Sequence, residues 1–99
     1  MEANRIVLEA IATRKCLEGT YNRMVVTLAP HILYTRHDEL YVDAVTVERD
    51  GRPPRELKLG SFKVSGIHDP RVGDRPFEPE SGLFDRDAER YAGTTLFAI

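Results

Sequence analysis

Positively charged side chains and tyrosines are interleaved through the middle of this sequence. Between residues 21 and 63 the set comprises Arg23, His31, Arg36, Arg49, Arg52, Arg55, Lys58 and Lys63, together with Tyr21, Tyr34 and Tyr41. A surface that combines cations with aromatic rings can hold the phosphates of a single-stranded nucleic acid and stack its bases. Strand edges also carry Lys and Arg, because these charges block aggregation between sheets. The pattern therefore leaves two interpretations open: a nucleic-acid site, or ordinary charged strand edges.

Other kinds of chemistry find little support in the residue types. The sequence contains no Gly-rich phosphate loop, no GxSxG or HExxH motif and no pair of CxxC motifs. Its single cysteine, Cys16, lies at the end of a predicted helix, which favours a packed thiol over a nucleophile. The three histidines, His31, His37 and His68, lack the spacing of metal ligands. We therefore expect no enzyme activity, no metal site and no cofactor.

The composition is that of a small globular domain. The chain has 99 residues, of which 41% are hydrophobic and 30% charged, and its formal net charge is −2. A nucleic-acid site would therefore have to be a local basic patch. The single cysteine excludes a disulfide within the chain, and the sequence has neither a signal-peptide pattern nor a membrane-spanning run. We expect a cytoplasmic protein with no membrane partner.

Hydrophobic periodicity predicts one helix followed by short strands. Val7, Leu8, Ile11 and Ala12 share one face of a helix over residues 5–16. After Gly19 the period changes to two, and Asp50-Gly51 is a hairpin turn signal. The expected strands cover 18–22, 24–28, 31–36, 40–48 and 55–65. Short strands at this spacing indicate a mainly β fold with an N-terminal helix, closed as a small five-stranded barrel.

The last third of the sequence differs from the rest. Prolines and glycines from His68 onward predict loops. Asp85 is a candidate cap for a short helix over 86–91, and residues 94–99 are expected to form a short apolar strand. Because an apolar end is unstable in water, we expect this extension to pack on the barrel or on a second copy of the chain.

A series of short motifs resembles the WYL domain family, which is named for a Trp-Tyr-Leu triplet. The motifs are Gly19-Thr20-Tyr21; Val26-Thr27-Leu28-Ala29-Pro30 with His31 and Leu33; Tyr34 and Arg36; Leu40-Tyr41-Val42 with Ala44; and Arg55-Glu56-Leu57-Lys58-Leu59-Gly60-Ser61-Phe62. The similarity in order and spacing covers residues 5–67. Leu40 takes the place of the triplet Trp, and Val26 and Ser61 stand where the family often has Arg.

The resemblance implies an Sm-like or SH3-like barrel over residues 1–67, followed by a C-terminal extension over 68–99. Such domains serve as ligand sensors in bacterial transcription regulators, usually after a helix-turn-helix. Only four residues precede the predicted helix, so we expect a free-standing module. The implied ligand is single-stranded nucleic acid or a nucleotide. Carried over by position, the pocket residues are Tyr21, His31, Arg36, Tyr41, Arg55 and Lys58.

A second hypothesis is a protein-interaction or dimerisation module without a nucleic-acid ligand. The apolar end Leu96-Phe97-Ala98-Ile99 and the departures at Val26, Leu40 and Ser61 favour it, because they make the surface more apolar and less basic. This hypothesis predicts a homodimer or a protein partner in a regulatory system. It is compatible with the first, since each copy of a dimer could bind a ligand.

Overall fold

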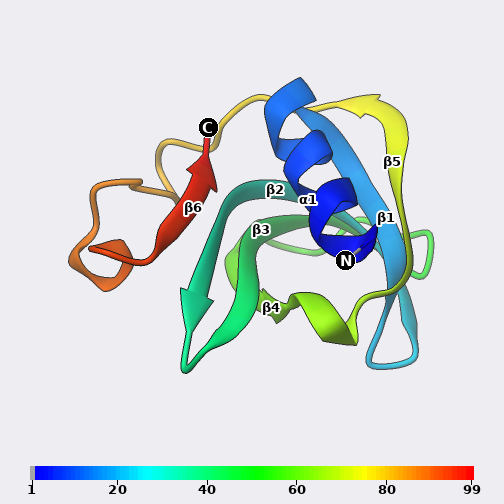
Figure 1. Ribbon diagram of the computed structural model, residues 1–99. Coiled ribbons are helices and arrows are strands. Elements are labelled where there is room, and N and C mark those ends of the chain that lie inside the picture. Colours follow the sequence, from blue (N-terminus) through cyan, green and yellow to red (C-terminus); the bar gives the residue numbers. More distant parts are fainter. Residues whose placement is uncertain (1) are drawn as a thin grey trace.

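A computed structural model describes residues 2–99 and shows a mainly β protein with one N-terminal helix (Figure 1). Helix α1 spans Glu2–Thr13, and the strands are β1 Lys15–Tyr21, β2 Met24–Arg36, β3 Glu39–Arg49, β4 Leu59–Lys63, β5 His68–Pro76 and β6 Thr95–Ala98. Two 3-10 turns, η1 Val64–Gly66 and η2 Glu89–Tyr91, complete the elements. At this level the predicted fold class is confirmed. No helix within residues 2–99 is long and apolar enough to cross a membrane.

The strands form one antiparallel sheet in the order β4-β3-β2-β1-β5, and β6 also pairs with β2. The predicted strands 24–28 and 31–36 form a single strand, β2, which runs through Pro30. The ladder between β2 and β3 pairs Pro30 with Ala44 and Ile32 with Asp43, so His31 is the extra residue of a bulge. The first part of β2 pairs with β1 and residues 32–34 pair with β6, as the curved ribbon in Figure 1 shows.

The predicted helix boundary was wrong by three residues. Helix α1 ends at Thr13, and Arg14 follows in the left-handed region with φ 55°. Strand β1 then begins at Lys15, so Cys16 lies in a strand and not at a helix end. Its side chain is buried nonetheless, as expected for a packed thiol.

The prediction of loops from His68 onward was wrong for residues 68–76, which form β5 beside β1. An edge strand tolerates Pro70, Gly73 and Pro76 because its outer backbone groups have no ladder partner to lose. The predicted helix over 86–91 is reduced to the 3-10 turn η2. The predicted C-terminal strand is confirmed as β6.

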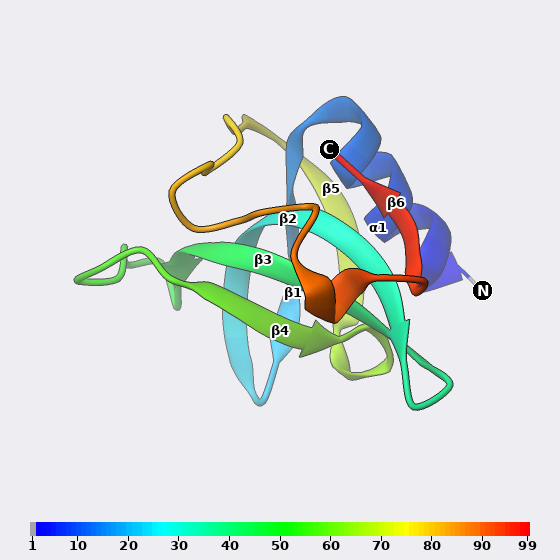
Figure 2. The same ribbon diagram turned by 90° about the vertical axis from the view of Figure 1, so that its left-hand side faces the viewer.

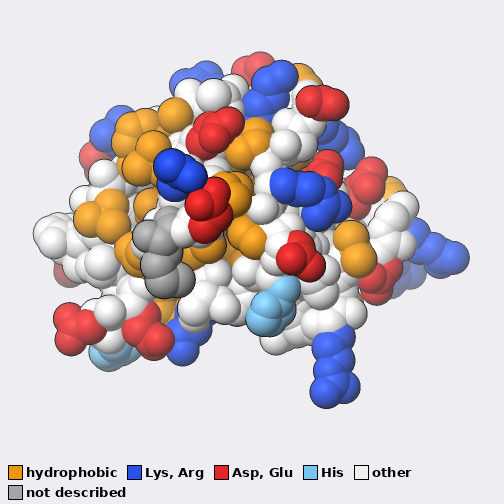
Figure 3. Space-filling view, turned by 45° about the vertical axis from the view of Figure 1, so that its right-hand side comes forward, with side chains coloured by type: hydrophobic (Ala, Val, Ile, Leu, Met, Phe, Trp, Pro, Cys, Tyr) orange, Lys and Arg blue, Asp and Glu red, His pale blue; other side chains and the backbone are white. Residues whose placement is uncertain are grey.

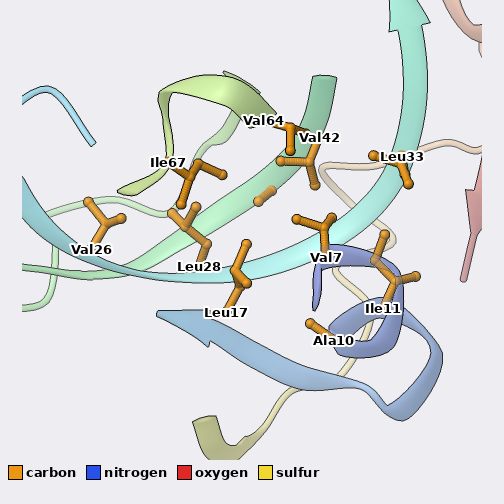
Figure 4. Packing of buried hydrophobic residues seen from close by; sticks show 11 residues of the cluster. Val7, Ala10, Ile11, Leu17, Val26, Leu28, Leu33, Val42, Val64 and Ile67 are labelled. Carbon is orange, nitrogen blue, oxygen red and sulfur yellow. The ribbon is translucent and has the colours of Figure 1, made fainter. Parts of the chain in front are cut away.

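The main hydrophobic core lies between α1 and the sheet (Figure 4). Val7 and Ile11 of the predicted helix face are buried, whereas Leu8 of the same face is 41% exposed. Leu17 of β1 and Leu28 of β2 belong to the same core. The helix therefore covers one face of the sheet and leaves the opposite face to other elements.

The C-terminal segment, residues 77–99, covers part of that opposite face. Ile32 and Tyr34 alternate with Leu33 along β2, so they lie on the side away from α1. They form a second apolar cluster with Phe84 and Tyr91 of the C-terminal segment. Part of β2 and β3 is thus buried on both faces.

Candidate functional site

A groove of about 620 Å³ opens beside β3, β4 and the loop over residues 50–58 that joins them. Figure 2 shows this loop projecting beyond the sheet. The lining residues that matter for binding are Thr46, Arg49, Arg55, Lys58, Gly60 and Phe62. The groove has the size of a typical small-ligand site. It therefore brings two of the predicted pocket residues, Arg55 and Lys58, into one cavity.

The base of the loop is fixed by a tight turn. Asp50 and Gly51 have φ values of 51° and 81°, as the predicted hairpin turn requires. The flanking residues exchange backbone hydrogen bonds, 2.8 Å from the Arg49 N–H to the Arg52 carbonyl and 3.1 Å in return. The Asp50 carboxylate also accepts a 3.0 Å hydrogen bond from the Val25 N–H of β2. These contacts hold Arg49 at the end of β3, on one side of the groove.

Strand alternation places the floor of the groove. Gly60 and Phe62 are two residues apart on β4, so they lie on the same face. They pair with Ala44 and Val42 of β3, and Thr46 continues that face along β3. The floor of the groove is therefore an extension of the sheet face that forms the main core, with an aromatic ring at one end.

The three cations of the groove make no ion pair, and the same is true of six other Lys and Arg side chains among residues 2–99. The three are distinguished by lining one groove. Within residues 2–99, no ion pair uses Arg49, Arg55 or Lys58, and all three are exposed. Elsewhere the ion pairs are Arg5–Glu2, Lys63–Glu39, Arg71–Glu18, Arg75–Glu48 and Arg90–Asp43. Figure 3 shows positive and negative side chains lying next to one another on the face that it presents. Glu56 is the one acid that lines the groove. Three cations are thus available to an anionic ligand.

The structure separates the other predicted pocket residues from this groove. Arg36 lies over the Tyr41 ring, with its guanidinium carbon 5.4 Å from the ring centroid, in the hairpin of β2 and β3. Tyr21 contacts Phe62 edge-on and does not line the groove. Sequence reasoning missed Arg49 and Phe62 as site residues. Two signals could have found them: Arg49 precedes the Asp50-Gly51 turn, and Phe62 alternates with Gly60 in the last family-like motif.

His31 is fully buried, and both of its ring nitrogens are bonded within the chain. Nδ1 lies 2.7 Å from the Ala29 carbonyl, which can only accept, so Nδ1 carries the proton. Nε2 accepts a 3.0 Å hydrogen bond from the Glu80 N–H. Burial lowers the pKa of His31 and favours this neutral form. In this arrangement His31 joins β2 to the C-terminal segment and has no nitrogen left for a ligand.

A buried carboxylate, Asp43, forms a polar cluster that the sequence did not reveal. It accepts hydrogen bonds from the Tyr34 hydroxyl at 2.7 Å, the Tyr91 hydroxyl at 2.5 Å and the Arg90 guanidinium at 3.0 Å. Burial raises the pKa of Tyr91, and its hydrogen bond to Asp43 raises it further. Burial also raises the pKa of Tyr34. Because every member is bonded within the cluster, it anchors the C-terminal segment to β2 and β3.

Comparisons with known proteins do not assign the chain to a family. No family model, curated protein or solved structure matches it. The groove is therefore interpreted from its own residues: three cations without ion pairs, one carboxylate and one aromatic ring.

Proposed function

We propose that this protein is a binding module that holds single-stranded nucleic acid or a nucleotide in the groove of β3, β4 and loop 50–58. One observation carries the proposal: Arg49, Arg55 and Lys58 line the same groove, and no ion pair within residues 2–99 uses them. Arginine binds phosphate through a planar two-donor fork, and lysine adds a compact charge. A chain of net charge −2 thus has a local site for anions.

The resemblance to WYL domains supports the same class of ligand. Arg55 and Lys58 belong to the last of the family-like motifs, and both line the groove. The proposal includes an Sm-like, SH3-type arrangement, which the curvature of β2 and the 3-10 turn η1 between β4 and β5 support. On this reading the module senses its ligand for a bacterial transcription regulator in the cytoplasm and carries out no chemical step itself.

The experiment that tests the proposal is binding of short, labelled single-stranded DNA and RNA, followed by fluorescence anisotropy. Binding should be stronger at low salt, because phosphate contacts release counterions. The double variant Arg55→Ala, Lys58→Ala should bind more weakly than the parent. If the parent binds neither probe at low salt, the proposal is wrong.

A second candidate function is self-association through β6. Leu96 is 57% exposed, the largest value among the exposed large hydrophobic residues. Phe97 and Ile99 pack against the main core, so deleting the whole strand would damage the fold. Leu96→Lys is the milder test: a dimer that uses this surface should become a monomer in light scattering. An unchanged molar mass would count against β6 as an interface.

A further inference from the structure

The ring of Phe62, which lines the groove, packs against the ring of Tyr21. The rings of Phe62 and Tyr21 meet edge-on, with centroids 5.0 Å apart and planes inclined by 75°. The Tyr21 hydroxyl accepts a 3.2 Å hydrogen bond from the Lys63 N–H, the backbone group that follows Phe62. Because Tyr21 is itself tied to β4, it limits the orientations that the Phe62 ring can adopt. The predicted pocket residue Tyr21 thus acts on the groove through its neighbour.

Gly60 has no side chain, and this leaves room for the Phe62 ring. A Cβ atom at this position would lie 3.3 Å from Cε1 and 3.6 Å from Cζ of Phe62. The first distance is tighter than an ordinary carbon contact, so a side chain here would push against the ring. Gly60 therefore lets the edge of Phe62 lie close over the β4 backbone, while the ring remains only partly buried and lines the groove.

The other tyrosine rings of strands β2 and β3 already pack against groups of the same chain. Tyr34 is buried in the Asp43 cluster, and Tyr41 is stacked on Tyr34 and covered by Arg36. Phe62 alone among the aromatic side chains in the described part of the chain lines the groove that holds Arg49, Arg55 and Lys58. An aromatic ring and three cations without ion pairs therefore share one cavity, which is an arrangement suited to binding a base and its phosphate together.

We infer that the groove binds the flat base of its ligand as well as the phosphate, and that Phe62 is the stacking surface. This inference rests on the proposed function and deepens it, because it names the part of the ligand that supplies affinity besides charge. Tyr21 and Gly60 are positioning residues for Phe62. The ligand class is then a nucleotide or single strand with an accessible base, and a bare phosphate chain is a poorer ligand.

The first arm of the test uses the unaltered protein. Its affinities for a short single-stranded DNA and for an abasic strand of the same length are compared by anisotropy at one salt concentration. Stacking of one base predicts tighter binding of the normal strand by roughly 5- to 150-fold. Equal affinities would overturn the stacking inference and leave the phosphate-binding proposal standing. Absence of binding by either strand at low salt would overturn both.

The second arm places a reporter at the ring. The chain contains four tyrosines but no tryptophan, so Phe62→Trp introduces a single tryptophan at the predicted stacking surface. Normal strands should quench its emission, and abasic strands should quench it much less. Tyr41→Trp is the matched control, because it introduces the same fluorophore outside the groove. Equal quenching of both tryptophans, or none at position 62, would overturn the assignment of Phe62.

A third arm covers the case in which the tryptophan disturbs the core. Gly60→Ala keeps Phe62 and forces only a small shift of its ring. It should weaken binding of the normal strand by several fold and weaken binding of the abasic strand much less. Equal loss for both strands would show that the ring does not contact a base.

Discussion

The hydroxyl of Tyr91 donates a 2.5 Å hydrogen bond to the buried carboxylate of Asp43, joining the turn η2 to strand β3. These residues are far apart in the sequence, and their contact ties the C-terminal segment to the sheet. Tyr91 is 2% exposed and Asp43 is 0% exposed. Water therefore cannot replace the hydrogen bond if it is lost.

Tyr91→Phe should destabilise the protein by about 1–3 kcal/mol, because a buried carboxylate loses a hydrogen-bond donor while the ring stays in place. Urea unfolding followed by circular dichroism measures the loss. Tyr41→Phe is the control, since it removes a hydroxyl from a half-exposed ring and should change stability by less than about 0.5 kcal/mol. Equal effects of the two variants would contradict the structural role given to Asp43.

The buried His31 predicts a loss of stability in mild acid. Burial lowers the pKa of the folded-state imidazole below its ordinary value of 6.5, so below that pH the unfolded chain binds a proton that the folded chain resists. The contribution is complete above about pH 6.5 and is lost as the pH falls toward the lowered folded-state pKa. Protonation would also turn Nε2 into a donor, so Nε2 could no longer accept the hydrogen bond from the Glu80 N–H.

Urea midpoints measured between about pH 5 and 7 test this prediction. His31→Leu removes the titrating group and should flatten the dependence in that window, whatever its effect on absolute stability. His37→Ala removes an exposed histidine at the hairpin tip and should leave the dependence as in the parent. An unchanged slope in His31→Leu would assign the effect to other groups.

Cys16 lines a second groove, of about 320 Å³, together with residues that include Leu57 and Phe77. Burial raises the pKa of its thiol, which lowers the fraction of reactive thiolate. We expect slow reaction with Ellman's reagent in the folded protein. Leu57→Ala shortens a side chain that lines the same groove and should accelerate the reaction roughly fivefold, since a half-buried leucine contributes about 1 kcal/mol.

Leu83→Ala is the matched control for this measurement. Leu83 is 39% exposed, close to the 44% of Leu57, but it does not line the groove that Cys16 and Leu57 share. Its replacement should leave the rate unchanged. An equal acceleration in both variants would indicate general opening of the fold and would contradict a local effect of Leu57 on this groove.

The local parts of the fold were predictable from local signals. The helical period identified Val7 and Ile11 as core residues, and Asp50-Gly51 marked a real turn because both positions adopt positive φ. The mainly β character followed from the period of two after Gly19. Arg55 and Lys58 were two of the six pocket residues carried over from the family resemblance, and both line one groove because they are neighbours in one short loop.

The parts that depend on distant contacts were not predictable. Two strands were expected where β2 is one, because the bulge at His31 that lets the strand continue depends on pairing with β3. Asp43 alternates along β3 like a surface residue, and its burial is caused by Tyr91 and Arg90 of the C-terminal segment. His31 was expected in a pocket because the family resemblance placed it there by position. Its partner Glu80 is 49 residues away in the sequence.

The salt dependence of binding to single-stranded DNA tests the central claim most directly. Each phosphate contact on a single strand contributes about 0.7 to the slope of log affinity against log salt. The double variant Arg55→Ala, Lys58→Ala should therefore bind more weakly, with a slope smaller by about 1.4. Arg71→Ala, Arg75→Ala is the matched control, because it removes two cations that are paired with Glu18 and Glu48 outside this groove.

The control should keep the slope of the parent protein, and only the double variant at Arg55 and Lys58 should lose part of that slope. Equal slopes for the two double variants would contradict the assignment of the groove as the phosphate site, as would a parent protein that fails to bind at low salt.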